Sequence, residues 1–308
     1  MENHHGSFKG VMAIIVASLL WGTTGTAASY SPDVSSLAIG AFSMGIGGVL
    51  LVITARKKLL IDYKLMLEQP KIFLLGVASV AIYPLAFYTS MRLSGVAIGT
   101  VVSIATAPFF AGILERLVSK KDISLQWMLS FVIGAIGIAL LTLGKDQSNN
   151  NAYSINQQGL GIILGCIAGL TYAGYSWAAR CLIESGVHST SSMSGLFGCA
   201  ALLLLPSLWF TGDNLFSSSS NAFVSLYMAI IPMFLGYLLF GFGLNYIDAS
   251  KATLITLIEP LVATVLAIVI IGEKFKVIGW AGVALVSLCL LMQTIKPQKK
   301  LRLAVKTM

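Results

Sequence analysis

The stretch Leu254–Ala263, LITLIEPLVA, places a carboxylate and a proline inside a run of mostly apolar residues from about Ala252 to Ile271. About twenty such residues span a bilayer core as a helix, so we expect Glu259 near the middle of the membrane. A carboxylate at that depth is unfavourable unless it faces the protein interior, finds partners or becomes protonated, which makes Glu259 a functional candidate. Pro260 lacks an N–H, so the carbonyl of Thr256 loses its helical partner and the helix is predicted to bend.

A second proline interrupts an earlier apolar run, in the stretch Ser103–Ala111, SIATAPFFA. The separation between Pro108 and Pro260 is close to half of the 308 residues. Two interrupted spans in matching positions point to the binding site of a transporter. We therefore assign Pro108, Glu259 and Pro260 to coupling or gating.

The composition indicates a membrane protein. Hydrophobic residues make up 56% of the chain and charged residues only 10%, with a mean hydropathy of +0.86, whereas a soluble domain carries roughly 25% charged residues. The net charge of +8 does not indicate nucleic-acid binding, because the lysines and arginines lie in short loops between apolar runs. The four cysteines lie within or at the ends of these runs, so we expect free thiols rather than disulfides or metal ligands.

The apolar runs predict an all-α integral membrane protein with ten transmembrane helices. Each run is near the length that a membrane-spanning helix needs. The expected spans cover roughly residues 10–30, 34–54, 71–91, 96–115, 124–143, 157–179, 190–209, 222–244, 250–271 and 277–295. When the chain is threaded through these spans, most lysines and arginines fall on the side of the N-terminus. Positively charged loops stay in the cytoplasm, so both termini are expected there.

The second half of the sequence repeats the first. Trp21-Gly22 in the first span corresponds to Tyr172-Ala173 in the sixth, and Tyr83 in the third corresponds to Tyr237 in the eighth. Each half holds five spans, and an odd number means that the halves have opposite orientations, as in the inverted repeats of many transporters. The predicted units are a first five-helix repeat over 1–145, a linker over 146–156, a second repeat over 157–295 and a basic cytoplasmic tail over 296–308.

Several aromatic residues lie in the middle third of their spans, namely Trp21, Tyr83, Tyr172 and Tyr237. Trp and Tyr usually gather at the membrane interfaces, so their position at mid-depth predicts a cavity that they line. The alternative is that their polar tips bond neighbouring helices while their rings fill the core. Polar residues would complete a substrate-binding site for a small molecule: Thr23, Thr24, Ser103, Thr106, Tyr175 and Thr256.

Other features have simpler interpretations. Gly161, Gly165 and Gly169 recur every four residues, which favours a closely packed helix face. Glu115 is interpreted as a surface carboxylate that pairs with nearby basic residues, and Asp248 as a helix cap. For Glu259 two roles remain open: a structural one, in which it ties the bend to a neighbouring helix, and a proton-carrying one.

The motifs Leu20-Trp21-Gly22, Gly236-Tyr237, Glu259-Pro260 and Gly272-Glu273 resemble those of an EamA-type member of the drug/metabolite transporter superfamily. The resemblance covers essentially the whole chain. It implies secondary transport, often export, of small organic solutes such as amino acids, metabolites or toxic compounds, usually across a bacterial inner membrane. One departure is that Lys120-Lys121 and Ala107 occupy the first-half counterparts of Gly272-Glu273 and Glu259.

Alternative functions are an intramembrane enzyme or a membrane sensor subunit. The three histidines, His4, His5 and His188, all lie outside the deep part of any span, and no nucleotide-binding loop is present. We therefore expect no enzymatic activity, no cofactor and no metal. The expected partners are a small-molecule substrate, the lipid bilayer and protons, with a monomeric or homodimeric protein. Neither the substrate nor the direction of transport follows from the sequence.

Overall fold

The computed structural model describes residues 2–94, 96–144, 155–271 and 276–294. Every regular element in these ranges is a helix, which confirms the all-α prediction. The first half forms α1 (Glu2–Gly22), α2 (Thr24–Ala28), α3 (Ser36–Leu67), α4 (Pro70–Ser94), α5 (Val96–Leu117) and α6 (Leu125–Leu143). The second half forms α7 (Ile155–Glu184), α8 (Ser189–Thr211), α9 (Ser219–Met228), the π-helix η1 (Ala229–Leu235), α10 (Gly236–Leu244), α11 (Ala249–Ile255), α12 (Ile258–Leu266), the π-helix η2 (Ala267–Ile271) and α13 (Val277–Thr294).

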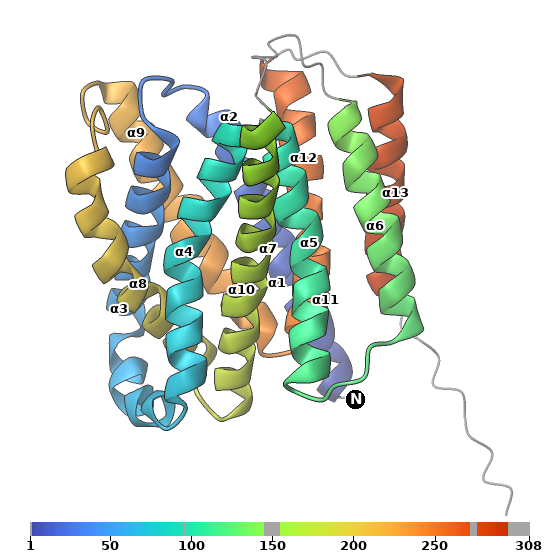
Figure 1. Ribbon diagram of the computed structural model, residues 1–308. Coiled ribbons are helices and arrows are strands. Elements are labelled where there is room, and N and C mark those ends of the chain that lie inside the picture. The colour runs from blue at the N-terminus through green and yellow to red at the C-terminus, as the bar shows by residue number, and fades with distance from the viewer. Residues whose placement is uncertain (1, 95, 145–154, 272–275, 295–308) are drawn as a thin grey trace, which may run out of the picture.

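The helices stand side by side in one bundle, with the connecting turns at its two ends (Figure 1). The chain enters α1 at the lower end of the bundle and α7 at the upper end, as drawn in Figure 1. Since α1 and α7 carry the first spans of the two predicted repeats, these elements run in opposite directions. Most of the linker at 146–156 and all of the tail at 296–308 lie outside the described residues.

Among the described residues, 7 helical segments are long and apolar enough to cross a membrane. They cover Gly6–Ala28, Ser36–Leu67, Pro70–Met91, Asn156–Glu184, Ser189–Thr211, Ser219–Leu244 and Ala249–Ile270. Two shorter apolar helices, Leu125–Leu140 and Val277–Met292, accompany them. Large apolar side chains such as Trp209 (90% exposed) and Phe210 (86% exposed) are open to the surroundings of the bundle, where hydrocarbon is their natural solvent. The protein is therefore a multi-pass membrane protein, and the number of ten spans stays a prediction.

The glycine row of α7 is a packing surface, as its spacing predicts. A β-carbon at Gly161 would lie 2.7 Å from Cβ of Ser94 at the end of α4, and one at Gly169 would lie 2.8 Å from the carbonyl oxygen of Ser103 in α5. Only a residue without a side chain lets these backbones approach so closely. The row thus holds α7 against α4 and α5, which brings together helices from the two halves.

The ninth predicted span is broken, but not in the way that the sequence suggests. The break lies between α11 and α12, at Thr256 and Leu257, and Pro260 falls in the first turn of α12, where a missing N–H is tolerated. The carbonyl of Thr256 is not free, because it accepts a hydrogen bond from the backbone N–H of Glu259 at 2.9 Å. The expected free carbonyl next to Glu259 is therefore wrong.

The expected interruption at Pro108 is also wrong, since α5 continues through this residue. Hydroxyl groups support the helix on this side: Ser103 donates to the carbonyl of Gly99 at 2.7 Å and Thr106 to that of Val102 at 2.6 Å. The same segment of α5 packs closely against Gly169 of α7. A role of Pro108 in gating stays a prediction.

The second interruption lies instead in the first span, where α1 ends at Gly22 and α2 begins at Thr24. The two breaks touch, because a β-carbon at Gly22 would lie 2.6 Å from Cβ of Val262 and 3.0 Å from the carbonyl oxygen of Glu259. The sequence contains no proline at this point, so its pattern gave no sign of the break.

Candidate functional site

An aromatic cluster fills the middle of the bundle. Tyr237 lies at its centre: its ring centroid is 4.9 Å from that of Trp21, 4.2 Å from that of Phe197 and 6.0 Å from that of Tyr175. Tyr172 extends the cluster, with its ring 5.3 Å from Tyr175. Further rings complete it on either side: Tyr83, Phe87, Tyr88 and Phe240. The structure thus brings together all five aromatic residues that the sequence assigned to the site.

Most of these five residues have their polar tips bonded to neighbouring helices. The indole N–H of Trp21 donates to the carbonyl of Pro232 at 2.8 Å. The hydroxyl of Tyr172 donates to Oγ1 of Thr256 at 2.9 Å, and the hydroxyls of Tyr175 and Tyr237 lie 3.2 Å apart. All four aromatic side chains are at least 95% buried. For these residues the geometry matches a bonded core, the alternative that the sequence left open.

Tyr83 differs from the other four residues because its hydroxyl is not bonded within the described part of the chain, and Tyr88 shares this feature. Both residues belong to α4, both are enclosed by protein, and both keep part of their surface accessible. Among the described residues, neither hydroxyl has a hydrogen-bond partner. Their rings are fixed by Phe87, whose centroid lies 5.5 Å from that of Tyr83 and 5.3 Å from that of Tyr88. Unpaired hydroxyls on fixed rings are suited to contact a bound molecule.

Glu259 faces the same space. The Glu259 side chain is partly accessible, as are those of Tyr83 and Tyr88, and we name the region of these three residues the Glu259 chamber. The Glu259 carboxylate belongs to the residue three positions after Thr256, to which Tyr172 bonds at 2.9 Å. In the described part of the chain it has no ion pair and no hydrogen-bond donor. An enclosed carboxylate without a partner in the middle of a span is a functional feature by default.

The remaining predicted residues lie around the chamber rather than in it. Thr24 donates to the carbonyl of Trp21 at 2.7 Å and so stabilises the break between α1 and α2. Ser103 and Thr106 use their hydroxyls within α5 and pack against α7. Thr256 accepts the hydroxyl of Tyr172 and donates to the carbonyl of Thr253 at 2.8 Å. The structure gives these residues structural contacts, and their contact with a substrate stays a prediction.

Sequence reasoning missed Tyr88, Phe87, Phe197 and Phe240. Tyr88 lies five residues after Tyr83, a spacing that places the two residues on different faces of a straight helix. Pro84 lies inside α4 between them. Only the fold shows that Tyr88 packs against Gly40 of α3. A β-carbon at Gly40 would lie 2.2 Å from Cε2 of Tyr88.

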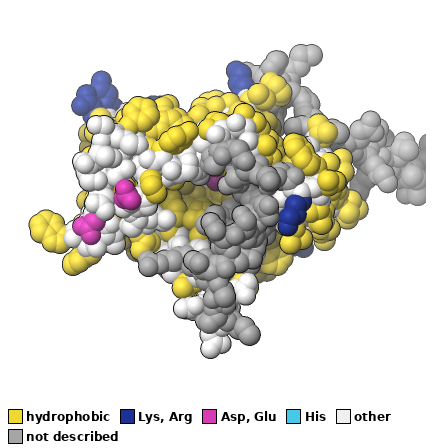
Figure 2. All heavy atoms as spheres, turned by 90° about the horizontal axis from the view of Figure 1, so that it is seen from above, with side chains coloured by type: hydrophobic (Ala, Val, Ile, Leu, Met, Phe, Trp, Pro, Cys, Tyr) yellow, Lys and Arg dark blue, Asp and Glu magenta, His cyan; other side chains and the backbone are white. Residues whose placement is uncertain are grey.

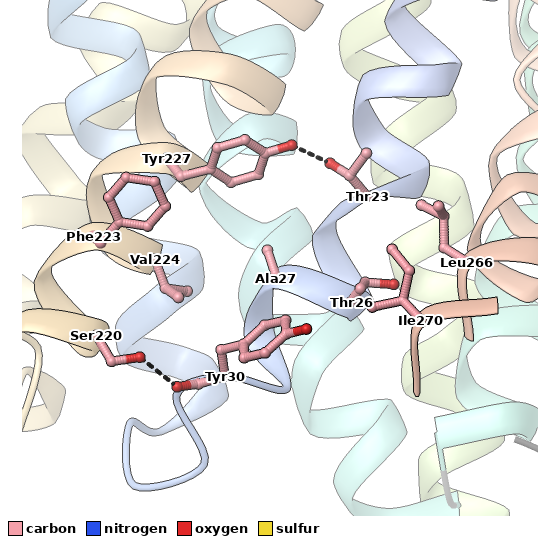
Figure 3. A pocket seen from close by; sticks show the side chains of 10 residues that line it. All are labelled: Thr23, Thr26, Ala27, Tyr30, Ser220, Phe223, Val224, Tyr227, Leu266 and Ile270. Carbon is pink, nitrogen blue, oxygen red and sulfur yellow. Dashed lines mark hydrogen bonds between the residues drawn. The ribbon is translucent and has the colours of Figure 1, made fainter. Parts of the chain in front are cut away.

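A pocket opens above the chamber, at the upper end of the bundle. Its volume is about 500 Å³. Two hydrogen bonds link its walls: Oγ1 of Thr23 and the hydroxyl of Tyr227 lie 2.8 Å apart, and Ser220 donates to the carbonyl of Tyr30 at 2.8 Å (Figure 3). Its lining comes from α2, α9, α12, η2 and the residues just before and after α2, through Thr23, Thr26, Ala27, Tyr30, Ser220, Phe223, Val224, Tyr227, Leu266 and Ile270.

The pocket and the chamber share their boundary elements. Thr23 of the pocket follows Gly22, which contacts the backbone of Glu259, and Leu266 lies on the same helix as Glu259. Figure 2 shows this end of the molecule from above, where the described residues form a hollow floored by hydrophobic side chains, with few charged side chains around it. The upper end therefore offers an apolar approach toward the middle of the bundle.

The lower end is held together by charged side chains. Nζ of Lys121, in the turn after α5, lies 2.6 Å from Oε1 of Glu184 and 2.7 Å from Oδ1 of Asp248. Arg180 lies 3.0 Å from the same atom of Glu184 and 3.7 Å from Asp248. Since these residues come from the α5–α6 turn, α7 and the α10–α11 turn, the network ties three parts of the lower end together.

Two interpretations of single carboxylates at this end are wrong. Glu115 is 5% exposed rather than a surface residue. Its Oε1 accepts the backbone N–H of Ser250 at 3.1 Å and so caps the start of α11. Asp248, the expected cap, makes no capping bond with its side chain and pairs with Lys121 instead. The free N–H groups at the start of a helix need an acceptor. Glu115 of α5 supplies it for α11, because Asp248 is paired with Lys121.

The described residues contain no group of three or more His, Cys, Asp and Glu side chains that could hold a metal ion. The apolar spans around an aromatic interior form the architecture of a polytopic membrane protein. Comparison with known proteins agrees. The chain matches the EamA-like transporter family over residues 8–143 and again over 159–294. It therefore belongs to the EamA-like transporter family.

Relatives extend over nearly the whole chain. The uncharacterized transporter YwfM of Bacillus subtilis (strain 168) is 32% identical over 290 residues, which cover 93% of this chain and 94% of the relative. The uncharacterized inner membrane transporter YicL of Salmonella typhimurium is 23% identical over 305 residues, covering 96% and 98% of the two chains. One solved crystal structure superposes with a TM-score of 0.76 at 15% identity, over 92% of this chain and 96% of that one, which shows a likeness of fold alone.

Proposed function

We propose that this transporter is a secondary exporter of small organic solutes, which works by alternating access in a bacterial inner membrane. The observation that carries the proposal is the difference between the two ends of the bundle. The upper end has an apolar pocket of about 500 Å³ above the Glu259 chamber. The lower end is closed by the network around Lys121 and Asp248. This asymmetry fits a conformation that is open toward one side of the membrane.

The broken helices supply the movable parts of this mechanism. The breaks at Thr23 and Leu257 and the π-helical segment η2 all lie beside the pocket or the chamber. Backbone that leaves the α-helical geometry within the membrane is tolerated where it borders a protein cavity, and in transporters such segments form the binding site. Bending of α2 and α12 at these breaks would close the upper end, and separation of the ion pairs would open the lower end.

The orientation that we propose places the lower end in the cytoplasm. Lys121 and Arg180 lie at this end, together with the turn that follows Arg56, Lys57 and Lys58. Positive loops favour the cytoplasmic side. Two inverted five-helix repeats then give both termini a cytoplasmic position and make the pocket face outward.

The proposal is tested by comparing metabolites inside and outside cells that express the protein with those of cells that lack it. An exporter lowers the intracellular level of its solute and raises the extracellular level. Cells that express the Glu259→Gln variant at the same level are the control, because this variant keeps the shape of the side chain. Identical profiles for all three cell types across conditions that stress export would refute the export function.

A further inference from the structure

The helix α3 is longer than a membrane crossing requires. It has 32 residues and so measures about 48 Å, whereas the hydrocarbon core is about 30 Å thick and the whole bilayer about 40–45 Å. The helix starts at Ser36 at the upper end of the bundle and leads into α4 at the lower end (Figure 1). Its last turns, from Arg56 to Leu67, therefore reach through the headgroup layer at the lower end, and we name this segment the α3 extension.

One face of the α3 extension is fixed to the bundle. Asp62 is 2% exposed, and its Oδ2 accepts the backbone N–H of His188 at 3.1 Å and lies 2.9 Å from Nδ1 of the same histidine. Met66 packs so closely against Gly195 that a β-carbon there would meet its Cε. Because His188 precedes α8 and Gly195 lies within it, the extension is held against α8 and has a defined outer face.

The outer face combines lysines with large apolar side chains. Four exposed residues are spaced three or four positions apart: Lys57, Leu60, Ile61 and Lys64. Residues at this spacing share one helix face, and this face is turned away from the buried Asp62. Leu60 is 74% exposed and Ile61 71%, which is unfavourable in water. The boundary between headgroups and acyl chains suits a helix face that is both apolar and cationic.

The cations of this region have no counter-charge from the protein. Residues 56–71 contain five lysines and arginines, namely Arg56, Lys57, Lys58, Lys64 and Lys71. Within the described part of the chain none of them forms an ion pair, whereas Arg116, Lys121 and Arg180 at the same end each pair with a carboxylate. Of the two acidic residues in the stretch, Asp62 is buried and Glu68 is exposed. An excess of unpaired positive charge is therefore left at the surface.

From the length of α3, its exposed face and its unpaired cations we propose that the α3 extension binds acidic phospholipids of the leaflet at the lower end. Side chains tilt toward the N-terminus of their helix, which for α3 is the upper end, so Lys64 leans back toward the membrane. Lys57 and Lys64 contact the lipid phosphates, and Leu60 and Ile61 contact the beginning of the acyl chains. Acidic lipids are preferred because a zwitterionic lipid neutralises its phosphate with its own ammonium group.

Native mass spectrometry of the purified protein tests the proposal, with phosphatidylglycerol and phosphatidylcholine of equal chain length as probes. We expect phosphatidylglycerol to bind at least tenfold more tightly. Glycerol 1-phosphate, which has the phosphate but no acyl chains, should not displace the lipid at millimolar concentration. Equal binding of the two lipids would overturn the proposal. Displacement by glycerol 1-phosphate would also overturn it, since the surface would then bind a free phosphate compound.

Two double variants assign the binding to the α3 extension. Each surface lysine adds about fivefold to the attraction of an acidic lipid, so Lys57→Gln with Lys64→Gln should weaken phosphatidylglycerol at least tenfold. The control, Lys9→Gln with Lys120→Gln, removes the same charge from exposed lysines at the same end and should leave binding unchanged. Unchanged binding in the first variant, or an equal loss in both, would contradict the assignment.

A third double variant separates a lipid from a soluble acidic partner. Leu60→Gln with Ile61→Gln keeps every charge and removes the apolar contact with the acyl chains, so phosphatidylglycerol should bind several-fold more weakly. Unchanged lipid binding in this variant would mean that charge alone is recognised and would overturn the proposal of a lipid surface. The binding measurements need no transported solute, so their result is independent of the export function.

Discussion

Gly22 packs against the backbone carbonyl of Glu259 so closely that a β-carbon at residue 22 would lie 3.0 Å from that oxygen. The same β-carbon would lie 2.6 Å from Cβ of Val262, below any distance that real side chains adopt. The contact joins the break in the first span to the break in the ninth, and both breaks border the proposed transport path.

Gly22→Ala should therefore push α12 away from α1. Insertion of a methylene-sized group into a packed contact costs about 1–3 kcal/mol, so we expect a lower melting temperature and a strongly reduced transport rate. The control is Gly25→Ala, three residues further along, where no atom lies within 4 Å of the added carbon. An equal loss in both variants would show that the close contact is not the cause.

The lower network should hold the lower end closed. Asp248→Asn removes a partner of Lys121 and should expose the neighbouring thiol of Cys181, which lies 3.9 Å from Oγ of Ser119. In a protein whose other cysteines are replaced by serine, we expect maleimide to label Cys181 several-fold faster. Asp122→Asn is the control, since Asp122 is 93% exposed and pairs only with Arg116 at the surface. No difference between the two variants would contradict a closing role of the network.

The same network should not depend on pH near neutrality. Burial lowers the pKa of Lys121, but its hydrogen bonds with Asp248 and Glu184 outweigh this effect, and the pKa is raised above 10.5. A raised lysine pKa gives stabilisation that is fully present below 10.5 and is lost as the pH rises through the folded-state pKa. The difference in melting temperature between Lys121→Met and wild type should thus stay constant from about pH 6 to 9. A decline within that range would show that Lys121 loses its proton there.

The aromatic cluster should divide into structural and binding members. Tyr237→Ala removes a ring that is 4% exposed and packed against four others, and a loss of about 3–5 kcal/mol is typical of such a truncation. Tyr83→Ala removes a partly accessible ring, so this variant should remain folded and lose transport. Gel filtration and melting temperature separate the two outcomes. Full transport in folded Tyr83→Ala would exclude Tyr83 from the path.

The inverted arrangement predicts the sides on which loops lie. Reporters that are active in the cytoplasm should work near Lys64 and after Met308, and a reporter that is active outside should work at Asn149. The reason is the odd number of spans expected in each half. If the reporters at Asn149 and after Met308 are active on the same side of the membrane, the inverted repeats are contradicted.

The sequence was sufficient for the fold class and for the aromatic interior. Long apolar runs decide the fold in a membrane, because every backbone polar group must be bonded within the span. Trp21, Tyr83, Tyr172 and Tyr237 were found because interfacial residue types at mid-depth are unusual, and Tyr175 was named only as a polar residue near them. The packing role of the glycine row in α7 could also be predicted, since a spacing of four residues places its members on one face of the helix.

The breaks and caps could not be predicted from local pattern. Proline lies inside the continuous helix α5, whereas the break at Thr23 has no proline. Whether a helix breaks depends on which neighbour supplies the missing bond, and that neighbour is distant in sequence. Glu115 shows the same limit, because the N–H that it caps belongs to Ser250. Tyr88 was missed because its place in the chamber depends on Gly40 of another helix.

The central claim is that solutes cross the membrane through the Glu259 chamber. Counterflow of a solute whose export the metabolite comparison identifies, in proteoliposomes without a pH gradient, tests it most directly, with wild type and Glu259→Gln reconstituted at equal density. We predict exchange by wild type and a loss of at least tenfold in the variant, because the variant removes the partly accessible carboxyl group that borders the proposed path. Undiminished exchange in the folded variant, with only gradient-driven accumulation lost, would contradict this account and leave Glu259 a proton carrier.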